Sequence, residues 1–281
     1  MICSGCCVLY RLYRHLAEIS LTYYPSFVVE SRNRSQKLYP MSIKNQKREA
    51  LCAELAKLFP NPRSELHYEN PYQLCIAVML SAQCTDKKVN QVTPRLFATY
   101  PDFIWLANAA VVEIEGIIRE VNYFKSKAKH LAQTAAIVSN DFCGELPLQR
   151  AQLLLLPGIG QKTANVILGE LGIEPTFPVD THVFRVSQRL GWAKAATTNE
   201  IEEQLKRRFA PHEWRNLHHR LILHGRQTCK AQNPLCSQCS LSEWCPSAQV
   251  ISNGHLRKKQ SNLRPANKIS TPRKSRTKSK R

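Results

Sequence analysis

The 281-residue sequence predicts an all-α protein, because apolar residues recur at helical spacing, glycine is scarce, and alternating strand patterns are hard to find. The first expected helix carries Leu51, Leu55, Leu58 and Phe59 on one face. The apolar faces that follow are, in chain order, Leu74, Val78 and Met79; Val89, Val92, Leu96 and Phe97; Ile114, Ile117, Ile118 and Val121; and Ala128, Leu131, Ala135 and Val138. The last four expected helices span 164–171, 179–190, 201–209 and 214–223.

Composition and charge narrow the class of partner. The 43% share of hydrophobic residues suffices for two packed domains or one large one, and the net charge of +19 indicates a polyanionic partner. Residues 256–281 hold eleven basic side chains and no acidic one, so 251–281 is expected to be a disordered basic tail. Its expected use is non-specific contact with a phosphate backbone; a nuclear address and a solubilising tail are the alternatives.

The eleven cysteines are an odd number and follow no secretory leader, which argues against a secreted protein with a disulfide framework. No apolar run approaches the roughly eighteen residues of a membrane span, so no membrane partner is expected. Residues 1–40 lack clear periodicity and form an N-terminal extension of uncertain role. A dispensable extension, a targeting arm or a true start at Met41 would each explain them.

Four cysteines near the C-terminal end stand in the spacing C-x6-C-x2-C-x5-C: Cys229, Cys236, Cys239 and Cys245. Zinc usually collects its cysteines as two short knuckles, and only the 236–239 pair has that spacing. The longer arms suit a 4Fe-4S cluster better, since its corners lie farther apart than the ligands of one zinc ion. We therefore expect these four thiols to hold a 4Fe-4S cluster.

The segment from Leu156 to Asn165 predicts a tight turn between two helices. Two glycines, Gly158 and Gly160, flank Ile159, and such a turn lets backbone amides approach a ligand closely. The turn precedes a helix N-terminus, which favours a phosphate. Lys162 falls in the first turn of that helix, where the positive helix end and partial burial are expected to lower its pKa.

Four segments together resemble one family. LPGIGQKTANVILGEL is similar to the helix-hairpin-helix of the endonuclease III family of DNA glycosylases, FPVDTHVFRVSQRLGW to its aspartate segment, and MLSAQCTDKKVN to a third motif. The cysteine spacing completes the set, and the resemblance covers roughly residues 41–250 in family order.

The resemblance implies a bifunctional DNA glycosylase with AP lyase activity that acts on oxidised pyrimidines in duplex DNA. Lys162 would attack the sugar, expel the damaged base and leave a Schiff base, while Asp180 would assist proton transfer and stabilise positive charge on the sugar. For Lys162 the alternative is a phosphate contact only. For Asp180 it is a helix N-cap, which can coexist with catalysis.

Gln83 resembles the family residue that enters the gap left when the target nucleotide leaves the stack. Asp86 is expected to cap the following helix, and Cys84 to serve packing. Two departures stand out. Asn122-Tyr123-Phe124 replaces the usual glycine and apolar wedge, which leaves the role of Tyr123 open, and the loop 230–235 carries one basic residue, fewer than many relatives have.

The resemblance also implies the domain organisation. A six-helix domain with the helix-hairpin-helix would span 64–174, an iron-sulfur cluster domain would combine 41–63 with 175–250, and the substrate cleft would lie between them. The alternatives are an adenine-mismatch glycosylase, against which Lys162 counts, and a non-enzymatic DNA-binding module. We expect a monomer that binds double-stranded DNA with damaged bases or abasic sites, in the bacterial cytoplasm at the nucleoid, or in a nucleus or mitochondrion if the source is eukaryotic.

Overall fold

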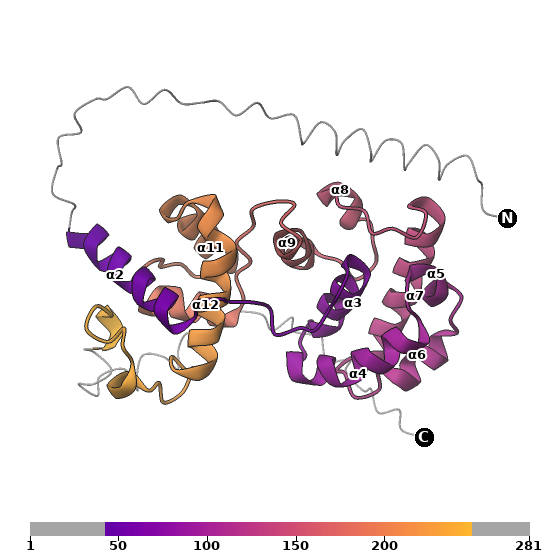
Figure 1. The fold of residues 1–281 in the computed structure, drawn as a ribbon, viewed down its shortest axis with the longest axis horizontal. Coiled ribbons are helices and arrows are strands. Elements are labelled where there is room, and N and C mark those ends of the chain that lie inside the picture. Colours follow the sequence, from indigo (N-terminus) through magenta and orange to yellow (C-terminus); the bar gives the residue numbers. More distant parts are fainter. Residues whose placement is uncertain (1–42, 249–281) are drawn as a thin grey trace, which may run out of the picture.

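The computed structural model describes residues 43–248, and every regular element within that range is a helix. The prediction of an all-α protein is therefore confirmed for this part of the chain (Figure 1). The helices are α2 (Ile43–Leu58), α3 (Pro71–Ser81), α4 (Asp86–Thr99), α5 (Phe103–Ala107), α6 (Val111–Ile117), α7 (Phe124–Asp141), α8 (Arg150–Leu153), α9 (Gln161–Glu170), α10 (Thr181–Arg189), α11 (Thr198–Arg208) and α12 (Trp214–Gln227), with short 3-10 turns at Pro211–Glu213 and Cys236–Gln238.

Two separate hydrophobic cores divide the described residues into two lobes. The first core runs from Leu66 to Leu168, and the second joins Leu51 and Leu55 of α2 to buried residues from 177 to 241. In Figure 1, α3 to α8 lie in one lobe, α2, α11 and α12 lie in the other, and α9 lies between them. The two cores support the expected domain limits, which stay a prediction.

Helix α3 forms the centre of the first lobe. Asn70 begins it as N-cap by accepting a hydrogen bond from the Gln73 amide at 2.9 Å, and Pro71 occupies the first turn, where its missing N–H costs nothing. Eight of its eleven residues are buried, from Tyr72 to Leu80. The expectation of a buried second helix is confirmed.

The expected helix limits differ from the observed ones because side-chain caps decide where helices begin. Asp180 caps α10, so that helix begins at Thr181 instead of residue 179. A capping box between Thr197 and Glu200 begins α11 at Thr198, three residues before the expected start. Leu58, expected on the buried face of the first helix, is 43% exposed at the end of α2.

Candidate functional site

The turn between α8 and α9 needs its first glycine for steric reasons. Gly158 has φ +82°, and a Cβ there would lie 3.0 Å from His130 and 3.1 Å from Met79. At Gly160, the N-cap of α9, a Cβ would meet no atom within 4 Å. Ile159 between them is only 5% exposed and packs into the first core. The turn is thus anchored by a buried side chain, and only its backbone is available to a ligand.

Lys162 lies in the first turn of α9 and is exposed to solvent. The partial burial expected from the sequence is wrong, because the helix turns its apolar face, with Ala164 and Ile167, toward the core and leaves Lys162 outside it. A primary amine at a helix N-terminus, next to free backbone amides, can bind a phosphate and can also attack an electrophilic carbon.

Asp180 is the N-cap of α10, as one of its two expected roles required. Its Oδ1 atom accepts a hydrogen bond from the Val183 amide at 2.7 Å. The Asp180 carboxylate is half-buried. Burial of Asp86 raises the pKa of Asp86, and the negative charge of Asp180 raises that pKa further. Asp180 therefore lies near the first turn of α4, on the side where the two lobes meet.

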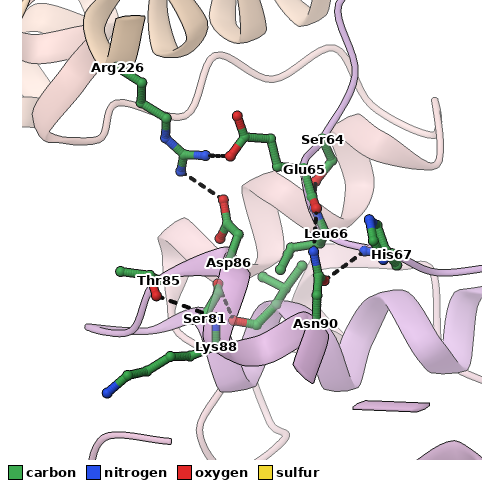
Figure 2. Close-up of polar contacts among 11 residues, drawn as sticks. Ser64, Glu65, Leu66, His67, Ser81, Thr85, Asp86, Lys88, Asn90 and Arg226 are labelled. Atoms are coloured by element: carbon green, nitrogen blue, oxygen red, sulfur yellow. Dashed lines mark hydrogen bonds and ion pairs between the residues drawn. The ribbon is translucent and has the colours of Figure 1, made fainter. Parts of the chain in front are cut away.

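Arg226 joins the lobes at this point. From α12 its guanidinium donates to Asp86 Oδ2 at 2.7 Å and also contacts Glu65 (Figure 2). Asp86 was expected to cap α4, and that expectation is wrong: Thr85 is the N-cap and accepts from the Lys88 amide, while the Asp86 carboxylate points to Arg226 (Figure 2).

A second group of contacts joins α9 to α12. The Glu170 carboxylate at the end of α9 accepts hydrogen bonds from Arg215 and from the hydroxyl of Tyr68, each at 3.1 Å, and pairs with His219. Burial favours the neutral acid, but the hydrogen bonds and charges of His219 and Arg215 outweigh it and lower the pKa of Glu170 to about 2. The helix that carries Lys162 is therefore tied to the second lobe.

Gln83 and Tyr123 project from neighbouring loops of the first lobe. Both are exposed non-glycine residues with positive φ, 53° for Gln83 and 59° for Tyr123. Tyr123 is 67% exposed, so its ring is accessible to a ligand. Cys84 packs half-buried against the first core, as expected.

The four cysteines of the C-terminal motif line one cavity of about 360 Å³, including space open to solvent. Between residues 43 and 248, no group of three or more His, Cys, Asp or Glu side chains is close enough to hold a single metal ion. Burial raises the pKa of the Cys236, Cys239 and Cys245 thiols, so a cationic centre would be needed to hold them as thiolates. Four thiols around one cavity are a ligand set that suits an iron-sulfur cluster.

Comparison with known proteins decides the family. Residues 76–211 match the HhH-GPD superfamily of base excision DNA repair proteins, and residues 229–245 match the iron-sulfur binding domain of endonuclease III. The endonuclease III of Synechocystis sp. is 43% identical over 217 residues, which is 77% of this chain and 99% of that protein. The chain belongs to the endonuclease III family.

Solved structures agree. A non-covalent endonuclease III–DNA complex is 40% identical, superimposes with a TM-score of 0.70, and covers 76% of this chain and 100% of its own. A trapped endonuclease III–DNA covalent intermediate has the same TM-score and identity and covers 75% of this chain. This member of the endonuclease III family is thus a base excision repair DNA glycosylase with AP lyase activity that binds DNA and a 4Fe-4S cluster.

Sequence reasoning missed the arginine that supports the first residues of the cysteine motif. Arg189 is 7% exposed and donates to Cys229 Sγ at 3.3 Å and to the Lys230 and Ala231 carbonyls at 2.7 and 3.1 Å. It fixes the loop that begins the cysteine motif. The sequence did contain a signal for the burial of Arg189. This residue lies three residues after Val186, on the apolar face of the same helix, where a solvent-exposed arginine is not expected.

No helix among residues 43–248 is both long and apolar enough to cross a lipid bilayer. The N-terminal extension 1–40 and the basic tail 251–281 lie outside the described residues, so their expected roles stay predictions.

Proposed function

We propose that this member of the family removes oxidised pyrimidines from duplex DNA with Lys162 as nucleophile and then cleaves the strand at the resulting abasic site. The observation that carries the proposal is the place of Lys162: an exposed amine in the first turn of α9, directly after the glycine turn. A lysine there is within the reach of a sugar whose phosphates bind the turn.

The reaction proceeds in two stages, base release and strand cleavage. The Lys162 amine attacks the anomeric carbon as the glycosidic bond breaks, and the base leaves with the electron pair and takes up a proton. Opening of the sugar gives an iminium ion, which makes the C2′ proton acidic. Loss of that proton breaks the C3′–O bond and releases the 3′ phosphate, and water then frees the lysine.

Asp180 supports the first stage. Its carboxylate stabilises the positive charge that develops on the sugar and accepts a proton from the ammonium that forms when the Lys162 amine adds to the anomeric carbon. One oxygen is engaged by the Val183 amide, which fixes the orientation of the group, and α10 places it at the seam between the lobes.

The glycine turn and the two exposed loop residues position the DNA. The backbone amides of Gly158 and Gly160 bind a phosphate of the damaged strand, which the open space at Gly160 supports. Ile159 contributes by anchoring the turn through its buried side chain and through its amide, which donates to the Leu156 carbonyl. Gln83 fills the gap left by the flipped nucleotide, and Tyr123 is the candidate wedge on the other side. Gln83 and Tyr123 are both exposed, and both adopt a left-handed backbone conformation, which supports this assignment.

Cys229, Cys236, Cys239 and Cys245 hold the 4Fe-4S cluster, which supplies a structural cross-link for the C-terminal segment. Their shared cavity and the match that begins at residue 229 and ends at 245 support this ligand set. The basic tail adds non-specific affinity for the DNA backbone. The enzyme acts as a monomer wherever the cell keeps its DNA, at a bacterial nucleoid or in a nucleus or mitochondrion.

A panel of duplexes, each with one lesion, tests the proposal. Wild-type protein should release oxidised pyrimidines and nick the strand, whereas Lys162→Gln should bind the same duplexes without nicking. Release of adenine from mismatches without nicking would indicate the adenine-mismatch class. Binding with no base release from any duplex would leave only a DNA-binding module.

A further inference from the structure

The chain between α3 and α4 adopts a turn that its own sequence does not favour. Helix α3 ends at Ser81. Two residues later, Gln83 has a φ of 53°, a backbone conformation that residues other than glycine rarely adopt. The local contacts are few: the Cys84 amide donates to the Ser81 carbonyl at 3.0 Å. Something outside the turn must hold Gln83 in this conformation.

Lys127 provides the first external contact. It lies one turn inside α7, is 9% exposed, and its Nζ atom donates to the carbonyls of Leu80 and Ala82, both at 2.7 Å. These carbonyls flank the C-terminal end of α3, where the helix dipole favours a cation. Burial lowers the pKa of Lys127, and no carboxylate among the described residues forms an ion pair with it.

Asn122 provides the second contact. Its Nδ2 atom donates to the carbonyl of Gln83 itself at 2.7 Å. Asn122 directly precedes Tyr123, the N-cap of α7, whose carbonyl accepts the first hydrogen bond of that helix from the Lys127 amide at 3.1 Å. The two donors therefore stand on either side of Tyr123 and both reach the Gln83 turn.

We propose that Lys127 and Asn122 are positioning residues that lock the Gln83 turn to the start of α7, so that Gln83 and Tyr123 enter the DNA stack as one rigid pair. The three hydrogen bonds from Lys127 of α7 and from Asn122, two residues before that helix, to carbonyls 80, 82 and 83 carry this inference. Gln83 and Tyr123 have no side-chain anchor of their own among the hydrogen bonds of residues 43–248, so their relative position depends on these backbone contacts.

The inference rests on the proposed function, because it assigns a role within nucleotide flipping. Its test compares full-length, cluster-loaded Lys127→Met and Asn122→Ala with two matched controls. Lys129→Met removes an exposed lysine of the same helix, and Asn140→Ala removes an exposed asparagine at its far end. The probe is a duplex with a tetrahydrofuran abasic analogue opposite 2-aminopurine, whose fluorescence reports how the unpaired base is stacked.

We expect both test variants to bind undamaged duplex like the wild type, to give a weaker 2-aminopurine response, and to release a damaged base about tenfold more slowly or worse in single turnover. Both controls should match the wild type. Folded Lys127→Met and Asn122→Ala proteins that match the controls would overturn the inference. If Lys127→Met does not fold, the exposed Asn122→Ala decides alone. A wild-type protein that releases no base would instead overturn the proposed function.

Discussion

At the residue scale, the Asp180 carboxylate serves both the fold and the chemistry. Its Oδ1 atom accepts from the Val183 amide, which begins α10, and the group lies at the seam between the lobes. The neutral amide of asparagine can still cap a helix but cannot offset charge on a sugar. The two roles can therefore be separated by one substitution.

Asp180→Asn should leave the free energy of unfolding within about 1 kcal/mol of the wild type. Base release should slow by about 100-fold or more, because a general acid–base group typically contributes that much. Urea unfolding and single-turnover base release measure the two effects. Wild-type turnover in a folded variant would reduce Asp180 to its capping role.

The two glycines of the turn differ in what they do. Gly158→Ala should lower the free energy of unfolding by about 1–2 kcal/mol or more, since φ is +82° and the new Cβ would press on His130 and Met79. The Cβ added by Gly160→Ala would meet no atom within 4 Å, so the free energy of unfolding should stay unchanged. The same Cβ should weaken DNA binding, because the backbone could no longer approach a phosphate as closely. Thermal melting and duplex titrations of the pair check this, and equal stability losses would contradict it.

At the element scale, apolar spacing predicted helix interiors better than helix ends. Apolar spacing located α3 and its buried Leu74 and Val78, because a buried helix face has a fixed period. Apolar spacing placed the start of α10 at residue 179, whereas the hydrogen bond from the Val183 amide to Asp180, whose capping role was one of its two expected roles, begins the helix at Thr181. Lys162 was placed on the correct helix turn, but its exposure depended on which face α9 turns to the core.

The contact between α9 and α12 gives stability a dependence on pH. Glu170 has a pKa of about 2 in the folded protein against 4.5 ordinarily. This shift adds about 3 kcal/mol to the free energy of unfolding at neutral pH. Because the folded pKa is lowered, this stabilisation is present above pH 4.5 and is lost as pH falls toward 2. The difference in unfolding free energy between the wild type and Glu170→Gln should shrink between pH 5 and pH 3. A difference that stays constant over that range would contradict the assignment.

At the scale of the whole molecule, the relation between the lobes was the least predictable feature. The Arg226–Asp86 and Arg215–Glu170 contacts join residues 140 and 45 positions apart, and no local pattern marks such partners. The cysteine motif and the glycine turn were predictable, because each chemistry needs fixed residue types at short spacing. Arg189, which supports the cysteine loop, could have been found from its position on the apolar face of α10, three residues after Val186.

The positive charge of the basic tail should affect DNA binding more than the chemical step. Residues 256–281 contribute eleven of the positive charges, and each phosphate they neutralise adds about 0.9 to the slope of log affinity against log salt. Deletion after Asn253 should flatten that slope for undamaged duplex and leave single-turnover nicking unchanged at saturating enzyme. Identical slopes for the full-length and truncated proteins would show that the tail does not contact DNA.

Borohydride trapping followed by peptide mapping tests most directly whether Lys162 is the nucleophile of this enzyme. Borohydride reduces a Schiff base to a stable amine, so the protein should become covalently attached to an oligonucleotide with one abasic site. Mass spectrometry of the digested adduct should place the sugar on Lys162, and Lys162→Gln should give no adduct. A sugar mapped to another amine, or an undiminished adduct in Lys162→Gln, would contradict the account.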